Sequence, residues 1–282
     1  MFAHLANPYR SDVRTVCFSS DNTAVLSGSH ESVKIWNRSA RVCIRTVADD
    51  VGYCLSSLFV AGDRQAVVGT KSGKILMVDV ASAEVTEAVE AHGAGKEVWG
   101  LSATHDGKGF ASASADQTVK FWDFELLAAG GGGDANAPKR LSAVHRRTLK
   151  LEEDALAVNL SADGRLVAVA LLDSTVKVFF ADTLKFFLSL YGHKLPVTAM
   201  DVSADSALIA TGGADKNLKI WGLDFGDCHK SIFAHDDGIT AVRFVPGTHL
   251  LFTAAKDGKV IILQYKFRLF NLILYYSLYR IL

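Results

Sequence analysis

The chain has 282 residues, 49% of them hydrophobic, so it is long enough to bury a large core. Its 30 lysine and arginine residues are balanced by 30 aspartate and glutamate residues, which argues against a protein that binds nucleic acid through bulk positive charge. The four cysteines show no C-x-x-C spacing, and residues 1–10 lack the basic-then-apolar pattern of a secretory signal. We therefore expect a protein of a reducing compartment.

Short strand-forming segments and turn signals alternate along the chain. In the first repeat, strands are predicted around Val13–Phe18, Thr23–Ser29, Ser32–Asn37 and Val42–Val47, with a turn at Ser20–Asn22. Similar groups of four strands follow, and the six repeats lie near residues 10–48, 49–90, 91–150, 151–191, 192–233 and 234–263.

Two sequence landmarks share one spacing. The third strand of the third repeat, Thr118–Asp123, ends in Trp-Asp, and the tryptophan place recurs at 36, 78, 122, 179, 221 and 263, in steps of 42, 44, 57, 42 and 42. The turn after the first strand recurs at 21, 63, 106, 163, 205 and 247, in steps of 42, 43, 57, 42 and 42. A period near forty with four short strands is typical of β-propeller blades. The predicted fold is therefore all-β, a propeller of about six four-stranded blades within residues 1–263.

The step of 57 identifies extra residues in the third repeat. Residues 125–140 include Gly130–Gly133 and Pro138, which are unfavourable in a strand. We expect a flexible, glycine-rich insertion between the third and fourth strands of that blade. A recognition arm is the functional alternative.

After Val260 the repeat pattern fails, because Leu263-Gln264 stand where Trp-Asp is expected. Residues 264–282 are predicted to be a non-repeat apolar tail, which can leave the ring of blades incompletely closed. A gene-model or splicing error is the favoured explanation, since the repeat stops within a strand. The alternatives are a misaligned last strand and a membrane tail, although the uncharged run Leu269–Tyr279 is shorter than a membrane span.

The stretch Ser114–Asp123, its echoes at Glu31–Asn37 and Asp215–Gly222, and the shared period resemble the WD-repeat family over about residues 10–263. This resemblance implies a buried structural tetrad of histidine, hydroxyl, carboxylate and indole groups that satisfy one another within a blade. The predicted tetrad residues are His92, Ser114, Asp116 and Trp122 in the third repeat, His193, Asp215 and Trp221 in the fifth, and Trp36 in the first. In this assignment the fifth repeat has Gly213 at the serine place, and the sixth, with His235 and Asp257, has neither hydroxyl nor indole.

A serine, a histidine and an aspartate also suggest a hydrolase built on Ser114 and His92. The sequence has no Gly-x-Ser-x-Gly motif, and the histidine and aspartate recur with the blade period, which catalysis does not require. The nine histidines are scattered, without the spacing of a metal site. We therefore expect no catalytic residue, no metal and no cofactor.

Longer strings are more specific. Asp182–Val197 and Lys219–Asp237 resemble the Dip-two type WD-repeat subunits of the UTP-B complex, and the match covers an internal portion, mostly of their second propeller. The resemblance implies a nucleolar, non-catalytic scaffold of the small-subunit processome, acting in ribosomal RNA processing. Its implied partners are other UTP-B and processome proteins, with pre-ribosomal and small nucleolar RNA contacted indirectly, and neither a membrane nor a small-molecule substrate. A generic WD-repeat adaptor, such as a ubiquitin-ligase substrate receptor, is the alternative.

Polar and aromatic residues that depart from the blade pattern are candidates for partner contact. Asp224, Phe225, Asp227 and His229 are predicted to lie in a loop between strands of the fifth repeat. The alternative is a well-packed loop without a binding role.

Overall fold

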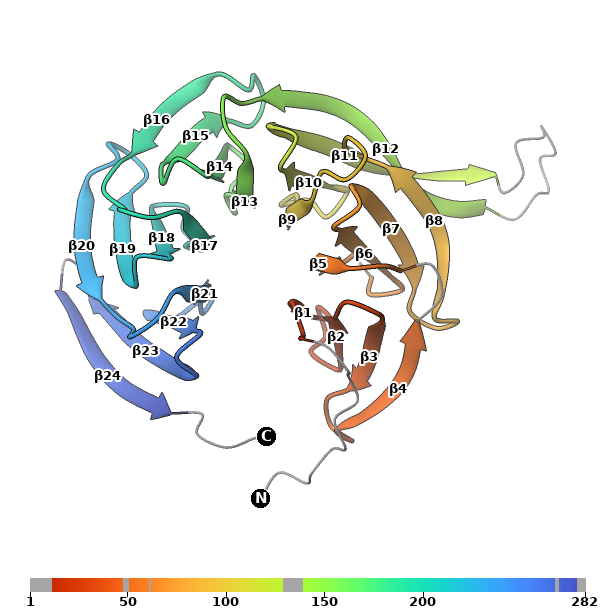
Figure 1. Cartoon of the computed structure of the whole chain (residues 1–282), viewed down its shortest axis with the longest axis horizontal. Coiled ribbons are helices and arrows are strands. Elements are labelled where there is room, and N and C mark those ends of the chain that lie inside the picture. The colour runs from red at the N-terminus through yellow and green to blue at the C-terminus, as the bar shows by residue number, and fades with distance from the viewer. Residues whose placement is uncertain (1–11, 48–50, 61, 129–138, 267–268, 278–282) are drawn as a thin grey trace. The chain divides into compact units, whose positions relative to one another are not determined.

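The computed structural model describes residues 12–47, 51–60, 62–128, 139–266 and 269–277. Within these ranges every regular element is a β-strand, and the strands form six four-stranded antiparallel sheets (Figure 1). In each sheet the four strands follow one another in sequence order. The predicted all-β fold of six four-stranded blades is confirmed.

The chain divides into two compact units, each with three blades. The strands of the N-terminal unit are β1 (Thr15–Phe18), β2 (Ala24–Gly28), β3 (Val33–Asn37), β4 (Val42–Val47), β5 (Cys54–Phe59), β6 (Gln65–Thr70), β7 (Lys74–Asp79), β8 (Glu84–Glu90), β9 (Val98–Ala103), β10 (Gly109–Ser114), β11 (Thr118–Ala128) and β12 (Lys139–Lys150).

The strands of the C-terminal unit are β13 (Ala155–Leu160), β14 (Leu166–Leu171), β15 (Val176–Phe180), β16 (Phe186–Leu190), β17 (Val197–Val202), β18 (Leu208–Gly213), β19 (Asn217–Gly222), β20 (Cys228–Phe233), β21 (Ile239–Phe244), β22 (Leu250–Ala255), β23 (Lys259–Lys266) and β24 (Leu269–Ser277).

The apolar side chains of each unit gather between successive blades. Val68 and Leu76 of the second blade pack in one cluster with Leu26 and Val33 of the first, and the opposite face of the second blade packs on the third. The C-terminal unit has the same arrangement across its fourth, fifth and sixth blades. Since each fully buried Val, Leu or Ile side chain stabilises the fold by about 1.5–3 kcal/mol, each blade stabilises its neighbours within a unit.

Close approach of two blades explains one glycine of the second strands. At Gly212 an added methyl group would lie 2.5 Å from Cγ2 of Ile239 and 2.8 Å from Cγ2 of Val242, both on the inner strand of the next blade. Only a residue without a side chain fits at that distance.

The periodic turn aspartates share one hydrogen-bonding pattern. In four of the blades the aspartate accepts a bond from a hydroxyl two residues earlier and from a backbone N–H two residues later. The hydroxyl–carboxylate pairs are Ser19–Asp21, Thr104–Asp106, Ser161–Asp163 and Ser203–Asp205, at 2.5–2.7 Å. The second blade differs: its backbone bonds place Val60 where the first blade has Ser19 and Gly62 where it has Asp21. Asp63, which the sequence spacing took for the turn aspartate, lies one residue later and accepts bonds from the backbone N–H and the hydroxyl of Ser20 in the first blade.

The glycine-rich insertion is shorter than predicted. Strands β11 and β12 pair continuously as far as Ala128 and Lys139, so residues 125–128 and 139–140 are strand instead of loop. Glu87 of β8 anchors this ribbon, since its carboxylate accepts bonds from the Ser142 hydroxyl at 2.7 Å and the Ala143 N–H at 3.2 Å. Figure 1 shows the ribbon extending past β8. Amino-acid composition, on which the predicted bounds of the insertion were based, does not reveal such tertiary contacts. Residues 129–138 lie outside the described part of the chain.

The predicted non-repeat tail also differs from the structure. Strand β24 pairs with β23 from Lys259↔Ser277 to Lys266↔Leu269 and completes the last sheet. Leu263, at the tryptophan place, is 1% exposed and packs in the core, so an apolar side chain keeps the packing role there without an indole. Of the explanations considered for this segment, a misaligned last strand is the one that agrees with the pairing of β24 with β23. No helix in the described residues is long and apolar enough to cross a membrane.

Candidate functional site

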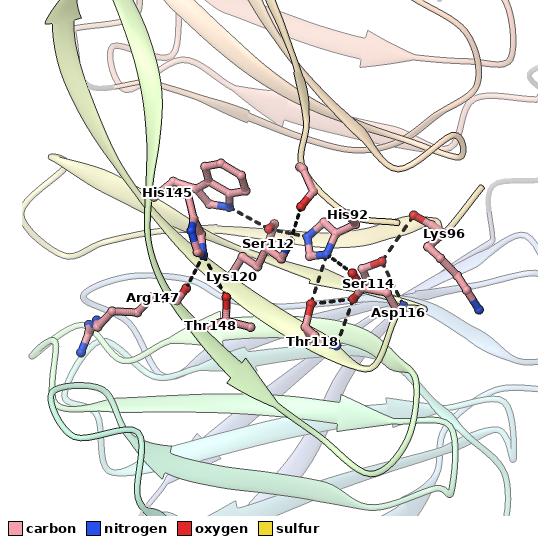
Figure 2. Close-up of polar contacts among 12 residues, drawn as sticks. His92, Lys96, Ser112, Ser114, Asp116, Thr118, Lys120, His145, Arg147 and Thr148 are labelled. Carbon is pink, nitrogen blue, oxygen red and sulfur yellow. Dashed lines mark hydrogen bonds and ion pairs between the residues drawn. The ribbon is translucent and has the colours of Figure 1, made fainter. Parts of the chain in front are cut away.

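The predicted tetrad exists in the third blade, but with a different hydroxyl (Figure 2). The Trp122 indole N–H donates to Ser112 Oγ at 2.9 Å, Ser112 Oγ lies 2.8 Å from His92 Nε2, and His92 Nδ1 lies 2.8 Å from Asp116 Oδ2. Ser112 therefore takes the place assigned to Ser114. The group links the second and third strands of the blade to the residues that precede its first strand.

Ser114 has another role. Its hydroxyl donates to the Lys96 carbonyl at 3.4 Å and accepts the Asp116 N–H at 3.2 Å, inside the turn. The sequence prediction chose the serine two residues before Asp116. The hydroxyl that reaches the indole is instead determined by the pairing of β10 with β11. Phe110 pairs with Trp122 and Ser112 pairs with Lys120, so the indole reaches the serine diagonally.

The fifth blade has the same diagonal contact, and in both the fifth and the sixth blade the structure identifies a hydroxyl that the sequence prediction did not find. Thr211 accepts the Trp221 indole N–H at 2.8 Å and lies 2.8 Å from His193 Nε2, while His193 Nδ1 lies 3.0 Å from Asp215. Gly213 is therefore not at the hydroxyl place. In the sixth blade the hydroxyl is contributed by Thr253, 2.9 Å from His235 Nε2, and His235 pairs with Asp257 at 3.1 Å.

The first blade keeps half of the group. The Trp36 indole N–H donates to Ser27 Oγ at 2.7 Å. His30 packs edge-on against the Tyr53 ring, with the ring centroids 4.8 Å apart. The indole–hydroxyl bond thus occurs in all three blades that have a tryptophan at this place.

Burial decides the protonation of these clusters. Desolvation lowers the pKa of His92 and of His193, against the raising effect of their aspartate partners. Burial alone would raise the pKa of Asp116, but hydrogen bonds from Thr118 and His92 lower it. The imidazoles of His92 and His193 are therefore neutral at pH 7. In each cluster Nδ1–H donates to the aspartate, Nε2 accepts the hydroxyl proton, and the hydroxyl oxygen accepts the indole N–H. Each of these donors and acceptors therefore has a partner.

These shifts predict that stability falls on acidification. The unfolded chain binds protons at histidines near pH 6.5, whereas the folded chain does not, so the histidine contribution is complete above that pH and is lost as pH falls below it. The lowered pKa values of Asp116, Asp215 and Asp257 add a second loss below pH 3.8. Melting temperatures at pH 7.5 and pH 5 test this prediction, and an equal or higher value at pH 5 would contradict it.

Ser112→Ala is expected to destabilise the protein more than Ser114→Ala. The first change leaves the Trp122 N–H and His92 Nε2 without partners inside the core, at a cost of about 2–3 kcal/mol. The second removes only two long hydrogen bonds in a turn, at a cost below about 1 kcal/mol. Urea unfolding of both variants measures the difference, and equal losses would show that the hydroxyl is assigned to the wrong serine.

The Ser112–His92–Asp116 order is that of a hydrolase triad, but the environment is not. Ser112 is 0% exposed, and its oxygen already accepts the indole N–H. A substrate carbonyl therefore cannot reach this hydroxyl. Ser114, the serine of the hydrolase hypothesis, has no hydrogen bond to His92 among the contacts of the described residues. Those residues also hold no group of three or more His, Cys, Asp or Glu side chains that could bind a metal ion.

The candidate partner-facing residues separate into two kinds. Phe225 is 86% exposed at the tip of the turn between β19 and β20. Asp224 accepts the Phe225 N–H at 2.9 Å, and Asp227 pairs with His229 at 3.1 Å, so these three residues build the turn. His229 belongs to β20, not to the loop.

The same polar residues explain why this repeat reads Trp-Gly where Trp-Asp is expected. A methyl group at Gly222 would lie 2.7 Å from Asp224 Oδ1 and 2.9 Å from both Asp227 Oδ1 and His229 Nε2. Side chains of the turn therefore fill the space that an aspartate at position 222 would need. Phe225 is the residue of this turn whose side chain projects into solvent.

An inter-blade carboxylate in the C-terminal unit was missed by sequence reasoning. Asp201 on β17 is 9% exposed, and it accepts bonds from Asn159 Nδ2 at 3.1 Å, Arg243 Nη1 at 3.0 Å and the Phe244 N–H at 2.8 Å. Burial raises the pKa of Asp201, and the Arg243 guanidinium opposes this effect. A signal was present, because Asn159, Asp201 and Arg243 stand 42 residues apart on the first strands of three successive blades.

Comparison with known proteins agrees with this geometry. The family described as the WDR3 second beta-propeller domain matches residues 12–273. The chain belongs to this family. Human "WD repeat-containing protein 3" is 57% identical over 189 residues, which are 67% of this chain and 19% of that protein. The WDR3 homologue of Dictyostelium discoideum is 50% identical over 68% of this chain.

The "U3 small nucleolar RNA-associated protein 12" of Saccharomyces cerevisiae is 47% identical over 193 residues, which are 68% of this chain and 20% of that protein. The chain thus spans about a fifth of the length of these curated relatives. The predicted resemblance to the WD-repeat family, and to its Dip-two type members, is confirmed. WD-repeat propellers of this kind are scaffolds and typically non-catalytic.

Proposed function

We propose that this chain is a non-catalytic interaction scaffold in ribosome biogenesis, as part of the small-subunit processome in the nucleolus. The observation that carries the proposal is the match of residues 12–273 to the second propeller of WDR3. The name of the yeast relative, which places that protein with the U3 small nucleolar RNA, supports the assignment.

The structure supports a scaffold in preference to an enzyme. The histidine, hydroxyl and carboxylate groups capable of catalysis are paired in the core, whereas aromatic and charged side chains are exposed on turns and outer strands. Rigid blades can present such groups to several partner proteins with little motion. Because the formal net charge is zero, we propose that pre-ribosomal and small nucleolar RNA are contacted through UTP-B and processome proteins.

Affinity purification from human cells tests the proposal, since the human relative is 57% identical over the matched part. A tagged copy of the chain is expected in the nucleolus and should recover UTP-B proteins and U3 RNA. Recovery of ubiquitin-ligase subunits without processome proteins would support the generic adaptor instead.

Phe225→Ala tests the exposed turn in the same experiment. If Phe225 is a partner anchor, its loss should reduce recovery of partner proteins about tenfold or more without lowering the melting temperature. Phe186→Ala is the matched control, because Phe186 is an exposed aromatic residue on the outer strand of the fourth blade. An equal effect of both variants would contradict a specific role for the turn.

A further inference from the structure

A pocket lies between the first two blades of the N-terminal unit. Its volume is about 560 Å³, which is within the range of ligand-binding pockets. One wall is the outer strand β4, and the other is formed by the turns before β6 and after β7. The lining residues are Ile44, Arg45, Asp63, Arg64, Asp79, Val80 and Ala81.

The strand that borders this pocket has an open edge. Among the described strands β4 pairs with β3 alone, and residues 42–46 are all exposed, with Val42 at 48% and Ile44 at 44%. The corresponding strand of the second blade differs, because the Arg140 guanidinium of the long ribbon donates to the Thr86 carbonyl of β8. An uncovered outer strand with apolar side chains offers backbone and side-chain contacts to an additional strand.

The two carboxylates of the pocket already accept hydrogen bonds from neighbouring residues, whereas its two arginines have no ion partner in the described part of the chain. The Asp63 carboxylate accepts the N–H and hydroxyl of Ser20, and Asp79 Oδ1 accepts the N–H groups of Ala81 and Ser82.

Neither arginine of the pocket forms an ion pair within the described part of the chain. Arg45 donates only to the carbonyls of Ile44, at 2.9 Å, and Ala81, at 3.4 Å. Arg64 is exposed on the opposite side of the pocket. The two guanidinium groups therefore retain the donors that a carboxylate accepts best, in a two-pronged arrangement.

We propose that this pocket binds an extended, acidic segment of a partner protein, which lies along β4 and places a carboxylate between Arg45 and Arg64. Apolar side chains of the segment would alternate with the acidic ones and pack on Val42, Ile44 and Val80. The two fixed carboxylates and the apolar walls favour a peptide over a nucleic-acid strand, whose phosphates would meet Asp63 and Asp79. The site would give the proposed scaffold one docking position of defined chemistry.

Fluorescence anisotropy with the purified chain tests the site directly. The probe is a labelled nine-residue peptide of alternating valine and glutamate, compared with one of alternating valine and lysine. The valine–glutamate peptide is expected to bind, and the double variant Arg45→Glu, Arg64→Glu should weaken that binding at least tenfold. Binding of both peptides alike, or an unchanged affinity of the double variant, would overturn the proposal.

Arg165→Glu is the matched control for the charge reversal. Arg165 is exposed and occupies the same backbone position in the fourth blade, since its carbonyl accepts the Ala181 N–H as that of Arg64 accepts the Val80 N–H. This variant should bind the valine–glutamate peptide as the unaltered chain does. Ile44→Asp is a second test that leaves both arginines in place, and it should also weaken binding.

Two other occupants give distinct results. If β4 pairs with a second copy of the chain, sedimentation velocity will show a dimer that the double variant loses, and the proposal is overturned. Binding of a twelve-nucleotide single-stranded RNA that the double variant abolishes, without binding of the peptide, would also overturn it. Peptide binding by the purified chain is independent of processome recovery from cells, so failure of the scaffold proposal and failure of this site are distinguishable.

Discussion

Trp122→Ala is expected to lower the free energy of unfolding by about 3–5 kcal/mol. The indole is 4% exposed, stacks on Phe110 with a 10° interplanar angle, and meets the edge of the His145 ring at 5.3 Å. Its removal leaves a cavity between the second and third blades and an unpaired hydroxyl acceptor on Ser112. Urea unfolding followed by circular dichroism measures the loss.

Trp99→Ala is the control for this prediction. Trp99 is 41% exposed on β9 of the same blade, and its truncation should cost less than about 1 kcal/mol. Similar losses for Trp99 and Trp122, or a loss below about 1 kcal/mol for Trp122, would show that the buried hydrogen-bonded indole does not stabilise the blade.

Asp201→Ala is expected to destabilise the C-terminal unit by about 2–4 kcal/mol. The change leaves the Phe244 N–H buried without an acceptor and removes the partner of Arg243 and Asn159. Because these donors come from the fourth and sixth blades, the loss acts on the packing of three blades at once. Chemical denaturation of the variant measures it.

Asp201→Asn separates the charge from the shape of this side chain. The amide retains one oxygen acceptor for the Phe244 N–H, so the loss should be smaller than for alanine. Equal stability of Asp201→Ala and the unaltered chain would contradict an inter-blade role for Asp201.

Repetition made much of the fold predictable. The turn aspartates and the tryptophan places keep their spacing because each blade solves the same local problem. A carboxylate accepts the hydrogen bonds of a tight turn, and a large side chain fills the gap between two sheets. The strands of the first five blades, and the histidine–aspartate pairs at His92–Asp116 and His193–Asp215, follow from that pattern.

Other features depend on residues that are distant in sequence. Ser112 in place of Ser114 follows from the diagonal pairing of β10 and β11, and a count along one strand cannot show it. The continuation of β11 to Ala128 depends on Glu87 of another blade, and the pairing of β24 depends on β23.

The sequence by itself determined the blade period, the strand order and the family, because each of these is encoded within about forty consecutive residues. Only the tertiary structure decided which hydroxyl completes each histidine cluster and which pocket arginines have no ion partner in the described part of the chain. The pocket beside β4 and the Asp201 bonds join side chains of different repeats, and such contacts exist only when the blades pack against one another.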